Sequence, residues 1–336
     1  MMNNVSLDLN NLELKFALQA VRQAALLVRQ VQAELVTPAL MKKDRSPVTV
    51  ADYASQALVG HLIDQVFPND PLVGEEDSSA LQAPEARQTL ERVSQFVACF
   101  TSQASPERVS AWIDRGGGSP RRRFWTLDPI DGTKGFLRGD QYAVALALIV
   151  DGQVQVSALG CPNLTAGVQP EIGGPGLLVF AARDAGTWVE ALEDGDSSPT
   201  RLYVSALNNP LNARLLRSVE SAHTNVSKID HVAGALGVQT EPVRMDSQAK
   251  YALLAAGQAD IYLRLLSPDR PGYREKIWDQ AAGSLLVEEA GGVVTDLDGK
   301  PLDFTAGRML VNNRGICASN NLLHPLIIQA LHASGA

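Results

Sequence analysis

The chain has few cysteines and a deficit of basic residues, and each shortage argues against a class of protein. Only three cysteines occur in 336 residues, namely Cys99, Cys161 and Cys317, and their spacing matches no metal-ligand pattern. We therefore expect reduced thiols in a cytoplasmic protein. Lysine and arginine total 29 against 37 aspartate and glutamate residues, which gives a net charge of −8. This balance argues against non-specific binding to nucleic acid or to an anionic membrane.

Long apolar runs are missing as well. No stretch approaches the length of a transmembrane helix, and the first residues lack the basic region and apolar run of a signal peptide. No Gly-x-Gly-x-x-Gly motif stands between a strand and a helix, which argues against a dinucleotide-binding oxidoreductase. What is present is 45% hydrophobic and 20% charged residues, the composition of an ordinary soluble globular protein.

The length predicts about two domains. The acidic, Ser- and Gly-rich segment 193–200 is the candidate boundary between them. We expect an N-terminal α+β domain over residues 1–197 and a C-terminal α/β domain over residues 198–336. The second domain is expected to open with a strand at 201–205.

Periodicity and turn residues predict the elements around the most informative motifs. Apolar residues recur at helical spacing from Leu12 to Val36, and a second helix is expected from about Thr49, with Asp52 completing a capping box. A hairpin turn is expected at Asp151-Gly152. The Gly-rich and then basic segment 116–123 is interpreted as an exposed linker with a solvated charge run; the alternative is that one of its arginines collects a polyanionic substrate.

The central stretch reads Phe-Trp-Thr-Leu-Asp-Pro-Ile-Asp-Gly-Thr and begins at Phe124. Its first four residues predict a short buried strand that ends at Asp128, since Pro129 cannot donate to a β-ladder. Asp131-Gly132 is a turn dipeptide. Two carboxylates therefore follow a strand end, where α/β proteins bind ligands, and their oxygens suit Mg²⁺. The plain alternative is a surface turn, because Asp-Pro and Asp-Gly are common in turns.

This stretch resembles a known family. Asp-Pro-Ile-Asp-Gly-Thr is similar, residue for residue, to the metal-binding signature of the inositol monophosphatase superfamily. The continuation Lys-Gly-Phe-Leu-Arg, which ends at Arg138, resembles its bisphosphate nucleotidase branch. Val-Gly-Glu-Glu around Glu75 and Trp-Asp-Gln-Ala-Ala-Gly around Asp279 resemble the second and third signatures. The resemblance covers about residues 40–325 and implies a mixed α+β and α/β fold, a two-domain layered αβαβα sandwich.

The resemblance also implies a set of metal ligands. One Mg²⁺ is expected on Glu75, Asp128 and the carbonyl of Ile130, and a second on Asp128, Asp131 and Asp279. Packed together without cations, such carboxylates would repel one another by roughly 1–4 kcal/mol per pair at about 4 Å. Roughly two or three ions are expected, with inhibition by Li⁺. Local sequence alone favours a solvated loop around Glu75, and it leaves open that Asp279 is a plain helix N-cap.

Catalytic and substrate contacts follow from the same resemblance. Asp52 and Thr133 are the expected catalytic pair that orients the attacking water. The expected substrate contacts are Gly132, Thr133, His223, Ser247, Lys250 and Arg264. His223, the Asp-Ser-Gln-Ala-Lys-Tyr segment and Tyr-Leu-Arg are similar to the nucleotide-binding stretches of the branch, which often carries another histidine where this chain has Val226.

The implied activity is Mg-dependent removal of the 3′-phosphate of adenosine 3′,5′-bisphosphate. Its sulfated relative, 3′-phosphoadenosine 5′-phosphosulfate, is a further expected substrate, which would place the chain in sulfur assimilation. Two alternatives stay open: an inositol polyphosphate 1-phosphatase or inositol monophosphatase with the same metal core, and a nucleotide- or Li⁺-sensing module without turnover. The expected partner is a small nucleotide, neither nucleic acid nor membrane, and the chain is expected to be a monomer or weak homodimer.

Overall fold

The fold is described from a computed structural model, which covers residues 7–35, 46–165, 175–193, 198–219, 226–267, 270 and 272–335. The α-helices in these residues are α1 (Leu12–Leu35), α2 (Ser46–Val66), α3 (Arg87–Ala98), α4 (Pro106–Asp114), α5 (Thr133–Arg138), α6 (Val226–Leu236), α7 (Ala249–Ala255), α8 (Ala281–Glu289) and α9 (His324–Ala333). Short 3₁₀ turns are η1 (Ser79–Gln82), η2 (Pro84–Ala86) and η3 (Pro210–Asn212).

The strands form two sheets. The first sheet has the order β1 (Leu72–Gly74), β2 (Arg123–Asp131), β3 (Ala143–Val150), β4 (Gln153–Cys161), β5 (Leu177–Ala182), β6 (Gly186–Ala191) and β7 (Thr200–Leu202). The second has the order β11 (Gly292–Thr295), β12 (Ile316–Asn320), β10 (Ile261–Arg264), β8 (Leu215–Arg217) and β9 (Val243–Arg244). In the first sheet only the β1–β2 pair is parallel.

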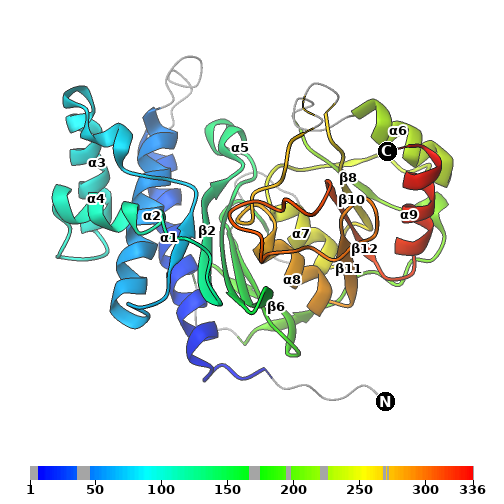
Figure 1. The fold of residues 1–336 in the computed structure, drawn as a ribbon, viewed down its shortest axis with the longest axis horizontal. Helices are drawn as coiled ribbons and strands as arrows, with labels where there is room; N and C mark the ends of the chain where they lie inside the picture. Colours follow the sequence, from blue (N-terminus) through cyan, green and yellow to red (C-terminus); the bar gives the residue numbers. More distant parts are fainter. Residues whose placement is uncertain are drawn as a thin grey trace.

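The elements stack in five layers, as Figure 1 shows. Helices α1 and α2 cover one face of the first sheet, and α7 and α8 lie between the two sheets. Helices α6 and α9 cover the outer face of the second sheet. The expected layered αβαβα sandwich is therefore confirmed.

Strand β3 illustrates why both faces of the first sheet are covered. Val144, Leu146 and Leu148 pack in the core against α1 and α2, whereas the alternate residues of the strand face the core shared with α8. Because side chains alternate across a strand, an all-apolar strand needs a layer on each side. Three of its four residues on the α8 side are alanines, and such small side chains let a helix approach closely.

Several expectations about individual elements need correction. Helix α2 is helical from Ser46, so Asp52 lies in its second turn and cannot complete a capping box with Thr49. Strand β2 does not end at Asp128; it continues to Asp131, with a register shift between these two residues that accommodates Pro129. The Asp151-Gly152 hairpin is confirmed, with both residues at positive φ.

Segment 116–118 is an ordered part of the first sheet's edge, not an exposed linker. Gly117 bridges Val73, and the amide of Gly118 donates to the carbonyl of Leu72 at 2.9 Å. A side chain on Gly118 would bring a Cβ within 2.4 Å of that carbonyl oxygen. The glycines are needed here for close backbone approach. The arginines that follow do not line the pocket described below: Arg122 pairs with Asp151, and Arg123 with Asp70 and Glu13.

The expected strand at 201–205 exists only as β7, and β7 pairs with β6 in the first sheet. It therefore extends the N-terminal sheet and does not open a second domain. One hydrophobic core also runs from the first sheet through α7 and α8 to the second sheet. The domain boundary at 197/198 remains a prediction.

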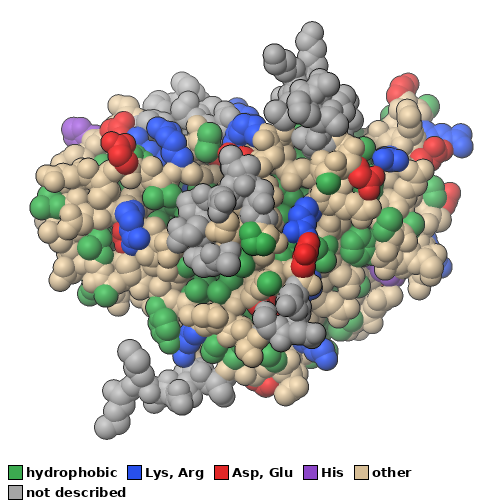
Figure 2. Space-filling view, turned by 180° about the vertical axis from the view of Figure 1, so that it is seen from behind, with side chains coloured by type: hydrophobic (Ala, Val, Ile, Leu, Met, Phe, Trp, Pro, Cys, Tyr) green, Lys and Arg blue, Asp and Glu red, His purple; other side chains and the backbone are tan. Residues whose placement is uncertain are grey.

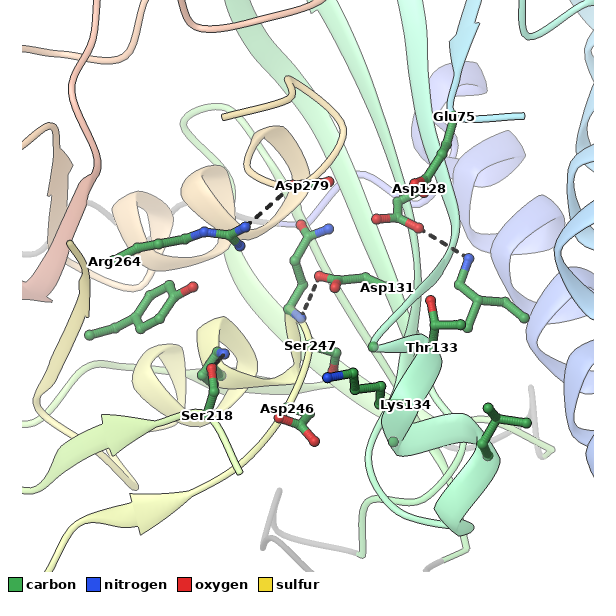
Figure 3. Close-up of a pocket in the computed structure, with 17 residues that line it drawn as sticks. Glu75, Asp128, Asp131, Thr133, Lys134, Ser218, Asp246, Ser247, Arg264 and Asp279 are labelled. Carbon is green, nitrogen blue, oxygen red and sulfur yellow. Dashed lines mark hydrogen bonds and ion pairs between the residues drawn. The ribbon is translucent and has the colours of Figure 1, made fainter. Parts of the chain in front are cut away.

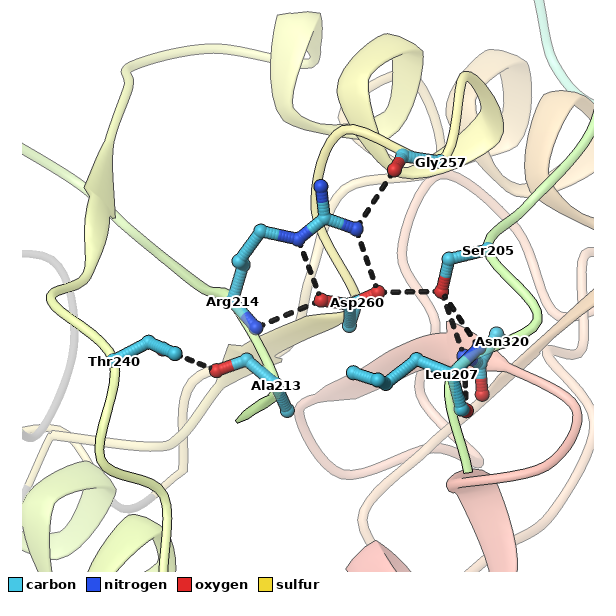
Figure 4. A network of polar contacts seen from close by, with 8 residues as sticks. All are labelled: Ser205, Leu207, Ala213, Arg214, Thr240, Gly257, Asp260 and Asn320. Carbon is cyan, nitrogen blue, oxygen red and sulfur yellow. Dashed lines mark hydrogen bonds and ion pairs between the residues drawn. The ribbon is translucent and has the colours of Figure 1, made fainter. Parts of the chain in front are cut away.

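A buried polar network ties the second sheet together (Figure 4). Asp260, which is fully buried, accepts hydrogen bonds from the backbone and the guanidinium of Arg214 and from the hydroxyl of Ser205. Asn320 joins the same network by donating to Ser205 at 2.9 Å. The start of β10 is thereby fixed next to β8 and the end of β12.

The surface agrees with the composition. On the face turned away from the viewer of Figure 1, acidic and basic side chains are interspersed among scattered apolar ones, as Figure 2 shows. None of the helices described is long and apolar enough to cross a bilayer.

Candidate active site

A cavity of about 460 Å³ lies between the N-terminal half of the molecule, which carries the first sheet, and the C-terminal half, which carries the second sheet. Its lining comes from the ends of β1 and β2, the start of α5, the loop before α7, strand β10 and the turn before α8. In Figure 3, Glu75 and Asp128 lie at one side, Arg264 and Asp279 lie opposite, and Asp131 lies between them. The four acids that were expected to bind metal thus line a single pocket.

The parallel pairing of β1 and β2 brings Glu75 next to Asp128. Gly74 pairs with Leu127, and Glu75 and Asp128 are the residues that directly follow this pair. Parallel strands place their carboxyl ends at the same edge of a sheet, which is why acids 53 positions apart in sequence meet here. Asp128 is 2% exposed, and its carboxylate accepts the amide of Ile130 at 3.1 Å.

Asp131 is aimed into the pocket by the irregular end of β2. Its carboxylate accepts the backbone amide of Gln248 at 2.8 Å, so it also holds the loop before α7. Gly132 follows with φ 93°, a conformation that favours glycine, and a Cβ there would lie 2.8 Å from the Cβ of Ser247. This glycine lets the chain turn directly from β2 into α5.

Asp279 reaches the pocket from the turn before α8. The N-cap position of α8 is Gln280, so the plain N-cap interpretation of Asp279 is wrong. Arg264 from β10 lies 3.8 Å from Asp279 and 2.9 Å from the buried carboxylate of Glu275. The arginine expected to bind substrate therefore also contacts an expected metal ligand.

The carboxylates raise one another's pKa values. Burial first, and then the charges of Glu76 and Asp131, raise the pKa of Glu75 to about 7, although by its accessible surface this residue is exposed. Burial followed by the charges of Glu75, Asp131 and Asp279 raises the pKa of Asp128 well above its usual range. Burial likewise raises the pKa of Asp279. Such crowding of acids in a cleft is typical of functional sites.

The donor set fits a hard divalent cation. Every candidate ligand is an oxygen, and after burial the pKa of Asp128 is raised by the charges of Glu75, Asp131, Asp279 and Asp52. In the part of the chain that the structure describes, no three His, Cys, Asp or Glu side chains are grouped closely enough to hold one ion, although the side chains of Glu75 and Asp128 lie within hydrogen-bonding reach of each other.

Asp52 and Thr133 come from two different helices beside this acidic group. Asp52 is buried in α2, where burial and then the charges of Glu76 and Glu75 raise its pKa well above the usual range. Thr133 is exposed at the start of α5 and lines the pocket. Between the described atoms of Asp52 and Thr133 there is no hydrogen bond in this arrangement, so their joint catalytic role stays a prediction.

The other side of the pocket contains a buried cation. Lys250 on α7 is 5% exposed, and its ammonium donates to the hydroxyl of Ser218 at 3.0 Å and lies 5.0 Å from the ring centre of Tyr262. Burial lowers its pKa to about 8. Ser247, one residue before Gln248, has φ 64°, which is strained for a residue other than glycine. His223 lies outside the described residues.

Some residues that shape the site were missed from the sequence. Gln248 donates its side-chain amide to the carbonyl of Trp278 and accepts from the amide of Gly283, so it joins the loop before α7 to the segment that carries Asp279. Asp246 pairs with Arg138 and accepts a hydrogen bond from the amide of Val219. These contacts have no local signal in the sequence, because each joins segments far apart in the chain.

Solved structures define the class of fold. The chain is similar to Mycobacterium tuberculosis SuhB, with 21% identity, 96% of each chain covered and a TM-score of 0.63. It is also similar to the inositol monophosphatase from Anabaena, with 21% identity, 96% of this chain and 95% of that chain covered and a TM-score of 0.61. At this identity the likeness establishes the inositol monophosphatase fold alone.

Sequence comparison then establishes the family. The profile of the inositol monophosphatase family matches residues 10–336, and the chain belongs to this family. It is 44% identical to a 3′(2′),5′-bisphosphate nucleotidase of Schizosaccharomyces pombe, over 96% of this chain and 95% of the relative. It is 43% identical to a protein of the same name from Oryza sativa, over 95% of this chain and 93% of the relative.

Proposed function

We propose that the chain is a phosphatase that removes the 3′-phosphate of adenosine 3′,5′-bisphosphate and releases AMP and phosphate. Water adds its oxygen to phosphorus, the bond from phosphorus to the 3′-oxygen breaks, and a proton ends on that 3′-oxygen. The observation that carries the proposal is a single pocket in which the four expected metal ligands lie together with a buried lysine. Relatives named 3′(2′),5′-bisphosphate nucleotidase, similar over nearly the whole chain, support the choice of nucleotide.

Mg²⁺ is the cation that we propose for the acidic side. Glu75, Asp128, Asp131 and Asp279, with the carbonyl of Ile130, are the residues that would hold it. Bound there, roughly two or three ions would neutralise phosphate charge and lower the pKa of water. The family resemblance further predicts inhibition by Li⁺. Asp52 and Thr133 would hold the attacking water in line, since positioning is the main task in phosphoryl transfer.

Lys250 is the residue that we propose for the second phosphate of the substrate. Its ammonium donates to the neutral hydroxyl of Ser218, while the charges of Asp131, Asp246 and Glu275 act on it without a direct ion pair, so a phosphate group would make the direct charge-assisted bond. Arg264, Ser247, Gly132 and the undescribed His223 remain proposed substrate contacts. A 5′-phosphosulfate carries negative charge at the same place, so the sulfated nucleotide is proposed as a second substrate.

A phosphate-release assay tests the proposal. The purified chain is given adenosine 3′,5′-bisphosphate, its 5′-phosphosulfate analogue and inositol 1,4-bisphosphate, each with Mg²⁺ and with a chelator. The proposal expects release from the nucleotides that depends on Mg²⁺ and a much lower kcat/KM for the inositol compound. Asp131→Asn is the matched inactive control, since it keeps the side-chain shape and removes the charge.

The same assay separates the remaining candidates. Preferred release from inositol 1,4-bisphosphate would replace the proposal by an inositol phosphatase, a candidate because the Anabaena protein of the same fold is named an inositol monophosphatase. Tight nucleotide binding with no phosphate release from any substrate would point to a sensing module. Release that continues unchanged in the chelator would contradict the proposed metal.

A further inference from the structure

Arg308, in the segment between β11 and β12, joins the two halves of the molecule beside the active site. Its Nη1 donates to the carbonyls of Gly116 at 3.1 Å and Gly118 at 3.2 Å, and its Nη2 donates to the carbonyl of Gly74. In Figure 1 the orange segment before β12 extends toward β2. Three backbone carbonyls from the N-terminal half thus converge on one guanidinium.

The carbonyl of Gly74 belongs to the residue before Glu75. On the other side of Glu75, the buried side chain of Gln56 accepts the amide of Glu76 at 3.0 Å and donates to the carbonyl of the same residue at 2.5 Å. A Cβ on Gly74 would lie 2.5 Å from the side-chain oxygen of Gln56. The backbone of Glu75 is therefore held between Gln56 from α2 and Arg308 from the C-terminal half.

The same guanidinium is attached to the segment that carries Asp279. It lies 4.9 Å from the ring centre of Trp278, the residue before Asp279. The amide of Ile277 donates to the carbonyl of Arg308 at 3.2 Å, and the amide of Leu310 donates to the carbonyl of Glu275 at 2.9 Å. These bonds pair the chain around Arg308 with the segment 275–277, so any shift of Arg308 relative to that segment would break them.

We infer that Arg308 is a positioning residue that sets the spacing between Glu75 and Asp279, the two acids that approach the pocket from different halves. The inference rests on the proposed metal site. Arg308 does not line the cavity, and in the described part of the chain no carboxylate pairs with it. Its contribution is geometric, because its rigid, planar guanidinium donates to three carbonyls and stacks on the indole of Trp278. A lysine cannot make all of these contacts.

The consequence is measurable as metal affinity. Residues that orient metal ligands without touching the ion typically alter affinity by about 10- to 100-fold when they are replaced. Arg308→Met keeps an unbranched apolar chain on Trp278 and removes all three hydrogen bonds. Arg308→Lys retains the charge and one or two of the bonds at most. We expect the dissociation constant for Mn²⁺ to rise by about 10-fold or more in Arg308→Met and by less in Arg308→Lys.

Arg183 provides a matched control. It also joins the two halves, because it donates to the carbonyl of Val154 at 3.0 Å and pairs with Glu288 at 2.8 Å. Glu288 lies near the end of α8, the helix whose other end follows Asp279, so Arg183→Met loosens the same helix away from the metal ligands. This variant is expected to unfold at a lower temperature but to bind Mn²⁺ within about twofold of the wild-type affinity.

The experiment is calorimetric titration of the full chain with Mn²⁺, together with thermal unfolding of each variant. Weaker binding in both Arg308 variants, with near-normal binding in Arg183→Met, supports the inference. Unchanged affinity in Arg308→Lys and Arg308→Met overturns it, as does an equal loss in Arg183→Met. If Arg308→Met does not fold, Arg308→Lys decides. A wild-type chain that binds no Mn²⁺ would instead refute the proposed metal site itself.

Discussion

Replacing Asp128 by asparagine is expected to stabilise the metal-free protein while removing its response to metal. Asp128 is the most deeply buried of the four acids proposed to bind metal, and Glu75, Asp131 and Asp279 all raise its pKa after burial itself. Asparagine has almost the same shape and retains an oxygen that can accept the amide of Ile130. The substitution therefore removes repulsion with little loss of packing.

The magnitude follows from the charges. A pair of like charges at about 4 Å costs roughly 1 kcal/mol in water and about 4 kcal/mol near a protein surface. Partial protonation relieves part of this cost, so we expect a gain of about 1–4 kcal/mol in the free energy of unfolding without metal. For a chain of this size, that corresponds to a rise in Tm of about 2 °C or more.

Added metal is expected to remove most or all of the advantage of Asp128→Asn. A ligand present at about 100 times its Kd stabilises the native state by about 2.7 kcal/mol. The wild type should gain this amount with Mg²⁺, and Asp128→Asn should gain little because a shared ligand is lost. The assay is chemical unfolding of both proteins, with a chelator and with Mg²⁺.

The pH dependence gives an internal check. The folded pKa of Asp128 lies above its unfolded value, so the folded state binds the proton more tightly. The loss of folding stability caused by ionised Asp128 is therefore absent below the unfolded pKa of about 4, and it grows as the pH rises above this value. The advantage of Asp128→Asn should vanish near pH 3. A variant that is less stable than wild type in the chelator at pH 7, or equally stabilised by Mg²⁺, would refute the reasoning.

Three further predictions concern other buried groups. Asp260→Asn should destabilise the protein, in contrast to Asp128→Asn. We expect it to lower the free energy of unfolding by about 2–4 kcal/mol, because it breaks the charge pair with Arg214. An unchanged midpoint of urea unfolding would contradict this. Lys250→Ala should raise KM for adenosine 3′,5′-bisphosphate by about 10-fold or more with a smaller change in kcat, and an unchanged KM would remove Lys250 from the substrate site. Burial lowers the pKa of His324 to about 4, so the unfolded state binds the proton of this histidine more tightly than the folded state does. In the folded state its ring is hydrogen-bonded to Thr295 and Ser319. Stability should therefore rise between about pH 4 and 6.5, and His324→Gln should reduce that rise by about 1–3 kcal/mol; identical slopes in the two proteins would show that His324 does not titrate in this way.

Most of the acidic site could be predicted because its residues stand in short contiguous motifs. Asp128, Asp131 and Gly132 lie within one strand and turn, and the apolar residues before them predict that strand. The meeting of Glu75 with Asp128 follows once β1 and β2 are parallel neighbours. The layered fold was likewise predictable from the resemblance of these motifs to one superfamily.

The rest depends on contacts between distant segments. Gly116 and Gly118 look like a linker in sequence, and only the approach of Leu72, Gln56 and Arg308 shows that they are packed. The continuation of β2 through Pro129 depends on its pairing with β3, which overrides the local signal. Arg308 carries no motif at all.

The central claim is that acids from both halves of the chain surround divalent cations in one pocket. Diffraction from crystals grown with Mn²⁺, with the anomalous signal of manganese mapped, tests this most directly. The account predicts peaks within coordination distance of Glu75, Asp128, Asp131 and Asp279. Well-diffracting crystals with no peak in this pocket, or with peaks only elsewhere on the surface, would contradict it.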